Sequence, residues 1–327
     1  MSIKQFPGGI VTKNPTAPTT AAAKGIWTLD QAMNFVKQGL WPRSPGAPTI
    51  GTATAGIGSA TVTYTAPADL GTGTVTFTAT SSPGGLTGTG ASPITVSGLT
   101  GATPYTFTVT ASTPGGTGPA SAASNSVTPL AVGDAYGGGF FAGQISTAGN
   151  SIADYNLVIG PVASAQGSKQ YKNANTATVG ATSVIDGPQN TADIVADGNA
   201  TVYPAAHFCN NLVIGGFTDW YLPAKNEVEI TYYNLKPNTT SNNTGSGINA
   251  NAVPARASNY TAGTPAQTSA ADFKDTGTQP LNGFFWSSTG NSGVGTAVLQ
   301  YFNTGAQYTG QPKTGVYNVR AIRRVAV

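Results

Sequence analysis

The chain has 327 residues, of which 39% are hydrophobic and only 8% are charged, and its formal net charge is +3. That charged fraction is far below the roughly 25% of an ordinary soluble domain, whereas the hydrophobic fraction is sufficient for buried cores. The basic residues are scattered, which excludes a nucleic-acid-binding stripe, and no apolar run approaches the length of a membrane span.

The composition also bears on where the protein works. Cys209 is the single cysteine, so an intramolecular disulfide is excluded, and we expect this residue to be a small buried hydrophobe. Abundant threonine and glycine with little charge are typical of all-β extracellular proteins, yet residues 1–9 carry no signal-peptide pattern. An extracellular-style chain without such a signal is what we expect of a virion protein, made in the host cytoplasm and released by lysis.

Residues 1–43 are predicted to form an extended arm followed by a short amphipathic helix. Thr28 and Gln31 fit a capping box, and Gly39 suits the C-terminal cap of the helix. A helix this short is not stable alone, so its apolar face needs a partner. We expect that face to dock the chain or to oligomerise it, the alternative being that it packs on the chain's own other domains. The predicted docking residues are Trp27, Leu29, Met33, Val36 and Trp41.

Residues 44–130 are predicted to form one β-sandwich. The runs that alternate with period two, separated by Pro/Gly turns, are 60–65, 74–80 and 105–111. This pattern is similar to a fibronectin type III domain, including Tyr105 as the framework tyrosine that caps the corner before the second-last strand. Tyr64 stands where that family usually has a core tryptophan. Because Asp69 is the only charge of the segment, we expect a spacer packed in an assembly, with direct ligand binding as the alternative.

Residues 131–327 are predicted to form a third module that contains strands and two helices. The glycine-rich stretch 134–145 leads into a strand, because the lysine and hydroxyl residue of a phosphate loop do not follow it. A second strand is predicted at 155–161. Apolar residues recur at helical spacing over 204–212 and 224–235, which predicts two helices.

Three motifs of this module carry a resemblance. Residues 215–223 read Gly-Gly-Phe-Thr-Asp-Trp-Tyr-Leu-Pro, residues 285–289 read Phe-Trp-Ser-Ser-Thr, and residues 319–325 read Val-Arg-Ala-Ile-Arg-Arg-Val. In this order, with a helix after the first, they resemble the C-terminal half of the DUF1566 family. That family looks like an elaborated C-type-lectin-like fold and is common in phage and bacterial surface proteins. The resemblance implies display and recognition rather than metabolism.

The resemblance gives framework roles to Trp220, Trp286 and Arg320. We expect both tryptophans in the core, and we expect Arg320 to pair with Asp219 or Glu227. Residues 1–43 in turn resemble N-terminal modules that recur on phage virion proteins. The expected fold class is therefore mainly β and multidomain: a short helical docking module, an immunoglobulin- or fibronectin III-like β-sandwich, and an α+β C-type-lectin-like domain.

Candidate chemistry is sparse in this sequence. His207 is the single histidine and sits on a predicted helix, so neither a zinc site nor a catalytic triad is indicated, and a buried or capping role is expected. Glu227 and Glu229 point to different faces of one helix, and we expect them to be solvated or paired with Lys225 or the terminal arginines. Trp286 is followed by two serines, so the calcium ligands of sugar-binding C-type lectins are incomplete. We expect no catalytic residue, no metal and no cofactor.

What remains is a surface for recognition. Residues 238–282 hold few apolar side chains, and we expect them to form an ordered, variable surface loop, the region where ligands are met in this fold. Aromatic side chains near loops are suited to stacking on sugars or filling protein hot spots. The predicted ligand-contact residues are Tyr221, Tyr260, Tyr301, Asn303 and Tyr308.

The sequence hypothesis is a phage virion structural protein displayed on the particle surface as a tail fibre, baseplate or capsid-exterior component. Its N-terminus would bind other virion proteins as a homo-oligomer, and its C-terminal domain would recognise a host surface glycan or protein. The alternatives are a bacterial cell-surface adhesin, which would need an export route, and an enzyme acting on glycans through its C-terminal domain.

Overall fold

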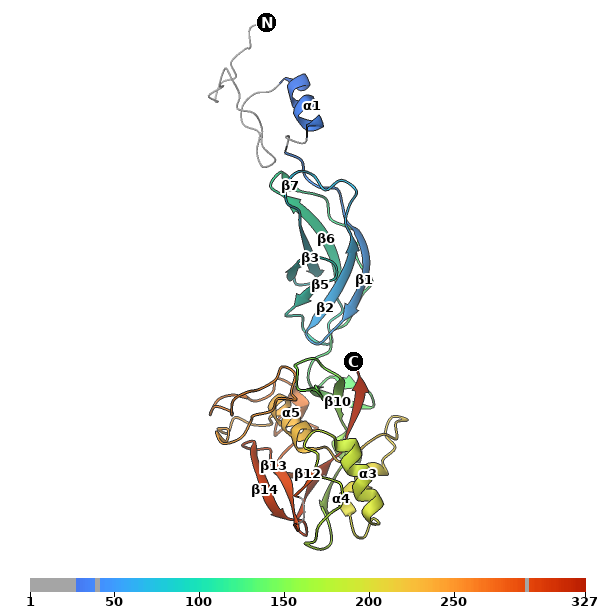
Figure 1. Cartoon of the computed structure of the whole chain (residues 1–327), viewed down its shortest axis with the longest axis vertical. Coiled ribbons are helices and arrows are strands. Elements are labelled where there is room, and N and C mark those ends of the chain that lie inside the picture. The colour runs from blue at the N-terminus through green and yellow to red at the C-terminus, as the bar shows by residue number, and fades with distance from the viewer. Residues whose placement is uncertain (1–27, 39–41, 292–293) are drawn as a thin grey trace. The chain divides into compact units, whose positions relative to one another are not determined.

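The computed structural model describes residues 28–38, 42–291 and 294–327, leaving out the side chains of Ala32 and Val36. The chain divides into two compact units, Met1–Ala131 and Val132–Val327, and each is described by itself. The described part is mainly β (Figure 1). Among the described helices, none combines the length and hydropathy that a bilayer crossing requires.

Helix α1 spans Leu29–Lys37 and begins with the predicted capping box. The Gln31 N–H donates to Thr28 Oγ1 at 3.2 Å, and the Thr28 N–H donates to Gln31 Oε1 at 3.0 Å. Of the predicted docking residues, Leu29 and Met33 are exposed, at 75% and 50%. Trp27, Trp41 and the side chain of Val36 lie outside the described residues. The described part of the predicted docking face is therefore apolar and uncovered.

The rest of the first unit is a sandwich of two antiparallel sheets. One sheet has the order β1-β2-β5, and the other has the order β4-β3-β6-β7. The strands are β1 Thr49–Ala55, β2 Ser59–Thr65, β3 Thr76–Ser82, β4 Thr87–Thr89, β5 Ile94–Ser97, β6 Thr106–Thr113 and β7 Gly116–Thr117. Alternate residues of β2, β5 and β6 point inwards, as the period-two pattern predicts. The buried core includes Ala60, Val62, Ile94, Val96, Phe107 and Val109.

The corner tyrosine is where the sequence places it. Tyr105 is buried, and its hydroxyl accepts a hydrogen bond from the Thr100 N–H at 3.1 Å. Tyr64 is only partly buried: its ring lies 4.7 Å from that of Phe77, and its hydroxyl donates to the Gly90 carbonyl at 2.9 Å. This strand arrangement with its corner tyrosine is that of a fibronectin type III-like, or immunoglobulin-like, sandwich.

An irregular segment closes one side of the sandwich through backbone bonds to β6 and through its side chains. The hydroxyls of Ser121 and Ser124 accept from the N–H groups of Val109 and Phe107 in β6, at 2.9 and 3.0 Å. The Asn125 amide bonds both the N–H and the carbonyl of Ala53 in β1, at 2.8 and 2.9 Å. These bonds occupy backbone groups that would otherwise be open to strand pairing with another chain.

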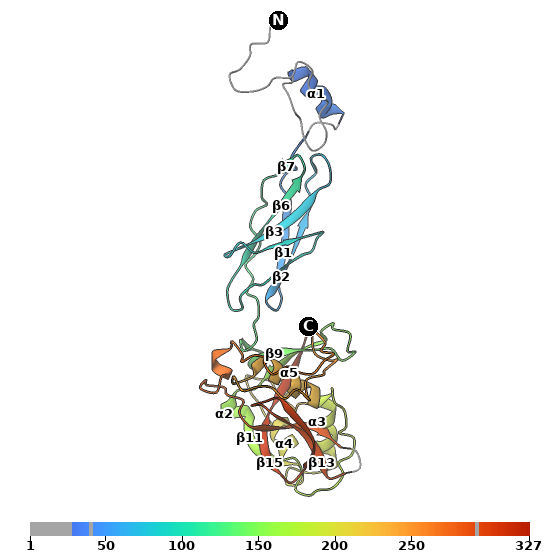
Figure 2. The ribbon, with the colours of Figure 1, turned by 90° about the vertical axis from the view of Figure 1, so that its left-hand side faces the viewer.

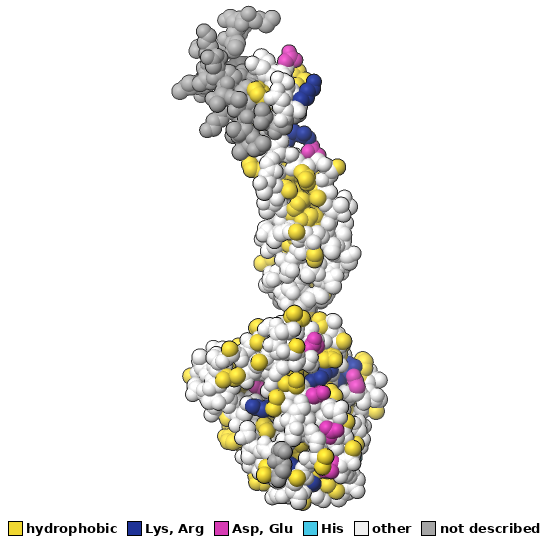
Figure 3. Space-filling view, in the orientation of Figure 1, with side chains coloured by type: hydrophobic (Ala, Val, Ile, Leu, Met, Phe, Trp, Pro, Cys, Tyr) yellow, Lys and Arg dark blue, Asp and Glu magenta, His cyan; other side chains and the backbone are white. Residues whose placement is uncertain are grey.

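Charge is nearly absent from the sandwich. Its one carboxylate, Asp69, pairs with Arg43. Figure 3 shows a visible face on which few charged side chains interrupt the neutral surface. Such a surface has little electrostatic repulsion to keep copies apart.

The second unit contains two sheets. The first has the order β16-β10-β9-β8 and joins strands from both ends of the unit, and the second has the order β11-β15-β12-β13-β14. The strands of the first are β8 Ala135–Tyr136, β9 Gly139–Ile145, β10 Tyr155–Ile159 and β16 Ile322–Ala326. Those of the second are β11 Gln166–Gln170, β12 Phe284–Gly290, β13 Thr296–Tyr301, β14 Ala306–Pro312 and β15 Val316–Arg320.

Helices cover both faces of the five-stranded sheet (Figure 1 and Figure 2). Side chains alternate across β12, so Phe285 packs into the core under α5 whereas Trp286 packs into the core under α3 and α4. The helices are α2 Val162–Ala165, α3 Gly187–Asp197, α4 Pro204–Asn210, α5 Lys225–Leu235 and the short 3-10 helix η1 Ala271–Phe273. Helices α4 and α5 confirm the sequence prediction within two residues at each end, and α3 is an addition to it.

Residues 238–282 fold back over α5 with η1 as their regular element. Tyr260, Phe273 and Leu281 are buried in the core under α5. The buried Asn242 amide donates to the Pro265 carbonyl at 2.9 Å, and Lys236 Nζ donates to the Thr240 carbonyl at 2.6 Å. The segment is thus an ordered part of the domain whose inner side is core, and not only the surface loop that its composition predicts.

Lys313 is a buried cation held by neutral oxygens. Its side chain is 0% exposed, and Nζ donates to Thr178 Oγ1 at 2.9 Å and to the carbonyls of Thr176 and Val294 at 3.1 and 3.2 Å. Burial lowers the pKa of Lys313 from its ordinary 10.5 to about 8. The folded protein therefore holds fewer protons than the unfolded chain between these two values.

This shift predicts a rise in stability with pH. Between about pH 8 and 9.5 the folded lysine loses its proton while the unfolded one keeps it, so we expect the second unit to gain about 1–2 kcal/mol. Urea unfolding across this range measures the slope. Lys313→Met should flatten it, whereas Lys37→Met, at an exposed lysine of α1, should leave it unchanged. A slope that persists in Lys313→Met would assign it to another group.

Candidate functional site

Glu227 lies at the start of α5 and is fully buried. Its carboxylate accepts hydrogen bonds from the Tyr221 hydroxyl at 2.7 Å, from the Ala224 N–H at 2.8 Å and from Arg324 Nε at 2.8 Å. Burial raises the pKa of Glu227, and Arg324 opposes that shift. The expected pairing with a terminal arginine is confirmed, but the carboxylate is not solvated. Tyr221 is buried as well, at 4% exposed, so its prediction as a ligand contact is wrong.

Glu229 is buried on another side of the same helix. Its carboxylate accepts from the Asn249 amide at 2.6 Å and from the Tyr260 hydroxyl at 2.5 Å, and it pairs with Arg256. The guanidinium carbon of Arg256 lies 4.1 Å from the ring centroid of Tyr233. Tyr260 is 5% exposed because its hydroxyl is committed to this pair, so its prediction as a loop-tip contact is wrong. Both glutamates hold the fold together and are out of reach of a substrate.

The terminal arginines pair differently from the prediction. Arg320 ends β15 and is buried, and it donates to the Gly160 carbonyl at 2.5 Å, Gln166 Oε1 at 2.7 Å and Gln279 Oε1 at 2.9 Å. Burial among these neutral acceptors lowers its pKa. The framework role of Arg320 fits this geometry, but the expected pairing with Asp219 or Glu227 is wrong.

Asp219 instead pairs with Arg323, and Glu227 with Arg324. These two arginines belong to β16, a different strand in a different sheet from β15. The chain passes from one sheet to the other at Ala321, so no single strand runs from Arg320 to Arg324. Arg320 and Arg324 therefore do not share one strand face.

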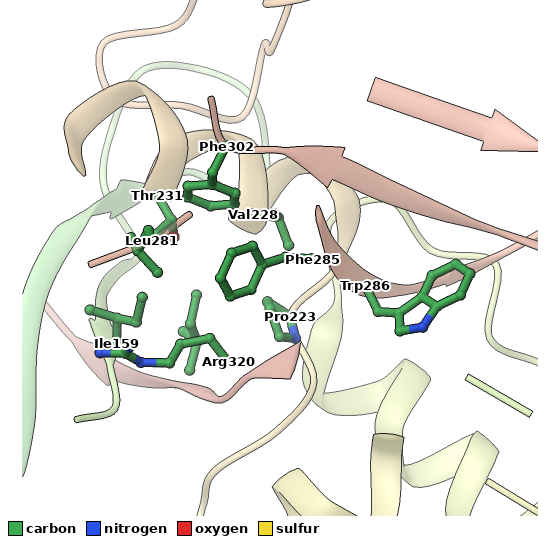
Figure 4. Close-up of a pocket in the computed structure, with 10 residues that line it drawn as sticks. Ile159, Pro223, Val228, Thr231, Leu281, Phe285, Trp286, Phe302 and Arg320 are labelled. Carbon is green, nitrogen blue, oxygen red and sulfur yellow. The ribbon is translucent and has the colours of Figure 1, made fainter. Parts of the chain in front are cut away.

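Trp220 and Trp286 lie in the core, as predicted, at 2% and 0% exposed. On the other side of β12 a small cavity of about 10 Å³ is lined mainly by apolar side chains, together with Thr231 and Arg320 (Figure 4). Figure 4 shows Phe285 and Phe302 facing into this space and Trp286 pointing away from it. A cavity of this size holds one water molecule at most, so it is a packing defect rather than a ligand pocket.

The histidine and the cysteine have structural surroundings. His207 Nε2 is 2.7 Å from the Gly198 carbonyl, which secures the turn after α3. Cys209 is fully buried, and burial raises the pKa of its thiol, which keeps it in the unreactive protonated form. Within the described ranges, no three His, Cys, Asp or Glu side chains come together as a metal site would require.

Four aromatic side chains gather on the α3/α4 side of the five-stranded sheet. We define this aromatic patch as Phe284, Tyr301, Tyr308 and Tyr317. The Phe284 ring stacks on that of Tyr301 with centroids 4.3 Å apart, and it lies 5.9 Å from Tyr308 and 5.7 Å from Tyr317. Tyr308 is 40% exposed, and the other three are partly exposed. Partly exposed rings on a rigid sheet are suited to stacking against a ligand.

The register of the sheet produces the patch. Phe284 pairs directly with Tyr301, and Tyr308 lies opposite Leu299. Tyr317 belongs to β15, and its ring is 5.1 Å from Trp286, the core residue beneath the patch. Helices α3 and α4 pack against β11, β15 and β12, so the corner at Phe284 and β14 is left partly uncovered.

The structure brings together two of the predicted contact residues, Tyr301 and Tyr308, and sets Asn303 beside them. Asn303 Oδ1 accepts from the Gly283 N–H at 3.0 Å, so Asn303 supports the turn next to the patch. Phe284 and Tyr317 were not predicted. Their signal is period-two spacing. Phe284 lies two positions before the buried Trp286, and Tyr317 lies two positions before the buried Val319, so each is on the outer part of a face whose inner part is core.

No family model matches the sequence, and no curated protein matches it. Among solved structures, the fibronectin type III domain of human fibronectin type III domain containing protein 3 is 21% identical over 27% of this chain and 87% of that chain, with a TM-score of 0.22. Chicken CNTN1 FN1-FN3 domains are 17% identical over 36% and 49%, with a TM-score of 0.23. Titin kinase and its flanking domains are 22% identical over 26% of this chain and 17% of that chain, with a TM-score of 0.22. Because these TM-scores are low, the fold of the sandwich is assigned from its own strand order and its corner tyrosine.

Proposed function

We propose that this chain is a structural protein of a bacteriophage particle, displayed on its surface. In this proposal residues 1–43 dock it to other virion proteins, the sandwich is a spacer, and the second unit recognises a host surface. The observation that carries the recognition role is the aromatic patch, a cluster of partly exposed rings fixed by strand register on a rigid sheet. Binding residues held by such a scaffold lose little conformational freedom when a ligand binds.

The convergence of the three sequence motifs supports a DUF1566-type, C-type-lectin-like identity for the second unit. Tyr221 of the first motif forms a β-bridge with Ile322 of the third. The Ser288 N–H of the second motif donates to the Pro223 carbonyl of the first at 2.7 Å. Segments far apart in the sequence thus form one framework, which is what a shared family scaffold requires.

Two features of the first unit support its proposed roles in docking and spacing. Leu29 and Met33 leave apolar surface uncovered on α1, and a helix of nine residues gains stability only by burying such a face. Self-association would bury it in a symmetric interface, so we propose a homo-oligomer on the particle. The low charge of the sandwich is compatible with close packing of neighbouring copies.

The proposal predicts that particle incorporation depends on residues 1–43. Particles assembled with a chain that lacks them should carry none of it, because the apolar docking face is gone, whereas the full chain with Tyr308→Ser should be incorporated normally. Immunogold labelling with antibody against residues 132–327 reads out both. Incorporation of the truncated chain would overturn the docking role, and labelling of cell envelopes without labelling of particles would favour the adhesin alternative.

A further inference from the structure

The aromatic patch continues across the sheet to α4 through one lysine. Lys169 in β11 pairs directly with Tyr317 in β15, and residues paired in this way have side chains on the same face. Lys169 Nζ lies 5.3 Å from the ring centroid of Phe208 in α4. Gly167 lies on the same face, since a Cβ there would be in ordinary contact with both Lys169 Cε and Phe208 Cζ, at 3.5 Å.

Beyond Lys169 the surface is hollowed. The hollow measures about 420 Å³ and is lined by Lys169, Ala200, Pro204, His207, Phe208, Asn211 and Leu212. No carboxylate is among these lining residues. The hollow therefore combines apolar walls with a cationic edge, on the same face as the patch.

The charge of Lys169 is not neutralised by the protein. Within the described residues it forms no ion pair, whereas Lys172 has Asp197 at 4.0 Å. The π-face of Phe208 stabilises the ammonium group only weakly, by about 0.5–1 kcal/mol at an exposed site. A partly exposed cation in this setting favours an anionic group of a ligand.

We propose that the aromatic patch, Lys169 and the hollow beside α4 form one binding surface for an acidic polysaccharide. Sugar rings stack on the patch, and a carboxylate of the same polymer binds Lys169. Strands lie about 4.8 Å apart, so β11 to β14 spans about 19 Å, which matches several linked sugars better than one. This inference rests on the recognition role proposed above and specifies its ligand.

The test uses the full chain on an array of bacterial polysaccharides. Each acidic polymer is printed beside its carboxyl-reduced form, which keeps the linkages and removes the charge. We expect binding to acidic polymers that weakens with salt. Lys169→Met should weaken it about five- to tenfold, a loss that carboxyl reduction should reproduce. Tyr308→Ser should weaken binding to both forms, and Lys274→Met, at a lysine next to η1, should change neither.

Binding to no polysaccharide, binding to neutral polymers alone, or equal binding by wild type and Lys169→Met would each overturn the proposal. Capture of a protein with the same dependence on Tyr308 and no polysaccharide binding would reassign the surface to a protein partner. Incorporation into particles is scored separately with the same variants, so a failure here is distinguishable from a failure of the virion role. Circular dichroism of Lys169→Met confirms that the variant is folded.

Discussion

Replacing Arg324 by methionine is expected to lower the free energy of unfolding of the second unit by about 3–5 kcal/mol at neutral pH. Arg324 is the cation that faces the fully buried carboxylate of Glu227, at 2.8 Å, and it also pairs with Asp186 at 3.6 Å. Its loss leaves Glu227 with hydrogen bonds from Tyr221 and Ala224 but without a counter-charge. The carboxylate must then either stay ionised in the core or take up a proton.

The pH dependence of this loss follows from the sign of the shift. Burial already raises the pKa of Glu227 in the wild type, and removal of Arg324 takes away the main opposing cause. Folded Arg324→Met therefore holds a proton at pH values where the unfolded chain has lost it. Its stability should be highest near the ordinary glutamate pKa of about 4.3 and should fall as pH rises through the folded value.

Chemical unfolding at several pH values measures both effects, with hydrogen exchange to assign them to the second unit. Glu227→Gln combined with Arg324→Met removes both charges and should recover most of the loss. Asp219→Asn is the matched control, since it breaks a pair whose carboxylate is 52% exposed and should cost about 1 kcal/mol or less. If Arg324→Met is no less stable than Asp219→Asn, the buried pair contributes no stability.

Sequence patterns predict local structure most accurately where that structure depends on residues close together along the chain. The capping box of Thr28 and Gln31 and the period-two strand around Phe107 depend on residues a few positions apart. The corner role of Tyr105 likewise involves Thr100, five residues away. These signals are local, so no knowledge of the tertiary fold is needed to read them.

The sequence does not predict burial where the ion-pair partners of a residue lie far away along the chain. Glu227 and Glu229 look like surface residues because their arginines lie 97 and 27 residues away. Burial of Tyr221 and Tyr260 follows from those same pairs, so both were wrongly expected at the surface. Helix α3 was missed because its buried apolar side is narrow, with Ile194 as its one large buried hydrophobe, although Asp186 caps it in the ordinary way.

Only part of the aromatic patch can be predicted from the sequence, because its other members are brought together by contacts between distant strands. Tyr301 and Tyr308 stand out in sequence as aromatic residues next to turns, but membership of one patch depends on strand order. The order β15-β12-β13-β14 brings Tyr317 next to Phe284, although β12 precedes β15 by more than one strand in the chain. Lys169 is more distant still in sequence, and its place beside Tyr317 is fixed by pairing of β11 with β15.

Trp286→Ala is expected to destabilise the second unit by about 3–5 kcal/mol and to leave the sandwich unaffected. The indole is fully buried, its N–H donates to the Lys169 carbonyl at 3.1 Å, and its ring lies 5.8 Å from Tyr171 and 5.1 Å from Tyr317. The substitution removes a large core side chain, and it also removes the support beneath Tyr317 and the bond that fixes the Lys169 backbone.

Calorimetry of the full chain measures the loss, and hydrogen exchange assigns it to a unit. Phenylalanine provides the matched comparison at the two core tryptophans. Trp286→Phe loses a hydrogen bond, whereas Trp220→Phe removes an indole N–H that is buried without a partner in the described structure. Trp286→Phe should therefore be the more destabilising of the two, by about 1 kcal/mol. Equal losses would mean that the bond to Lys169 contributes nothing, and the link from core to patch would then rest on ring packing alone.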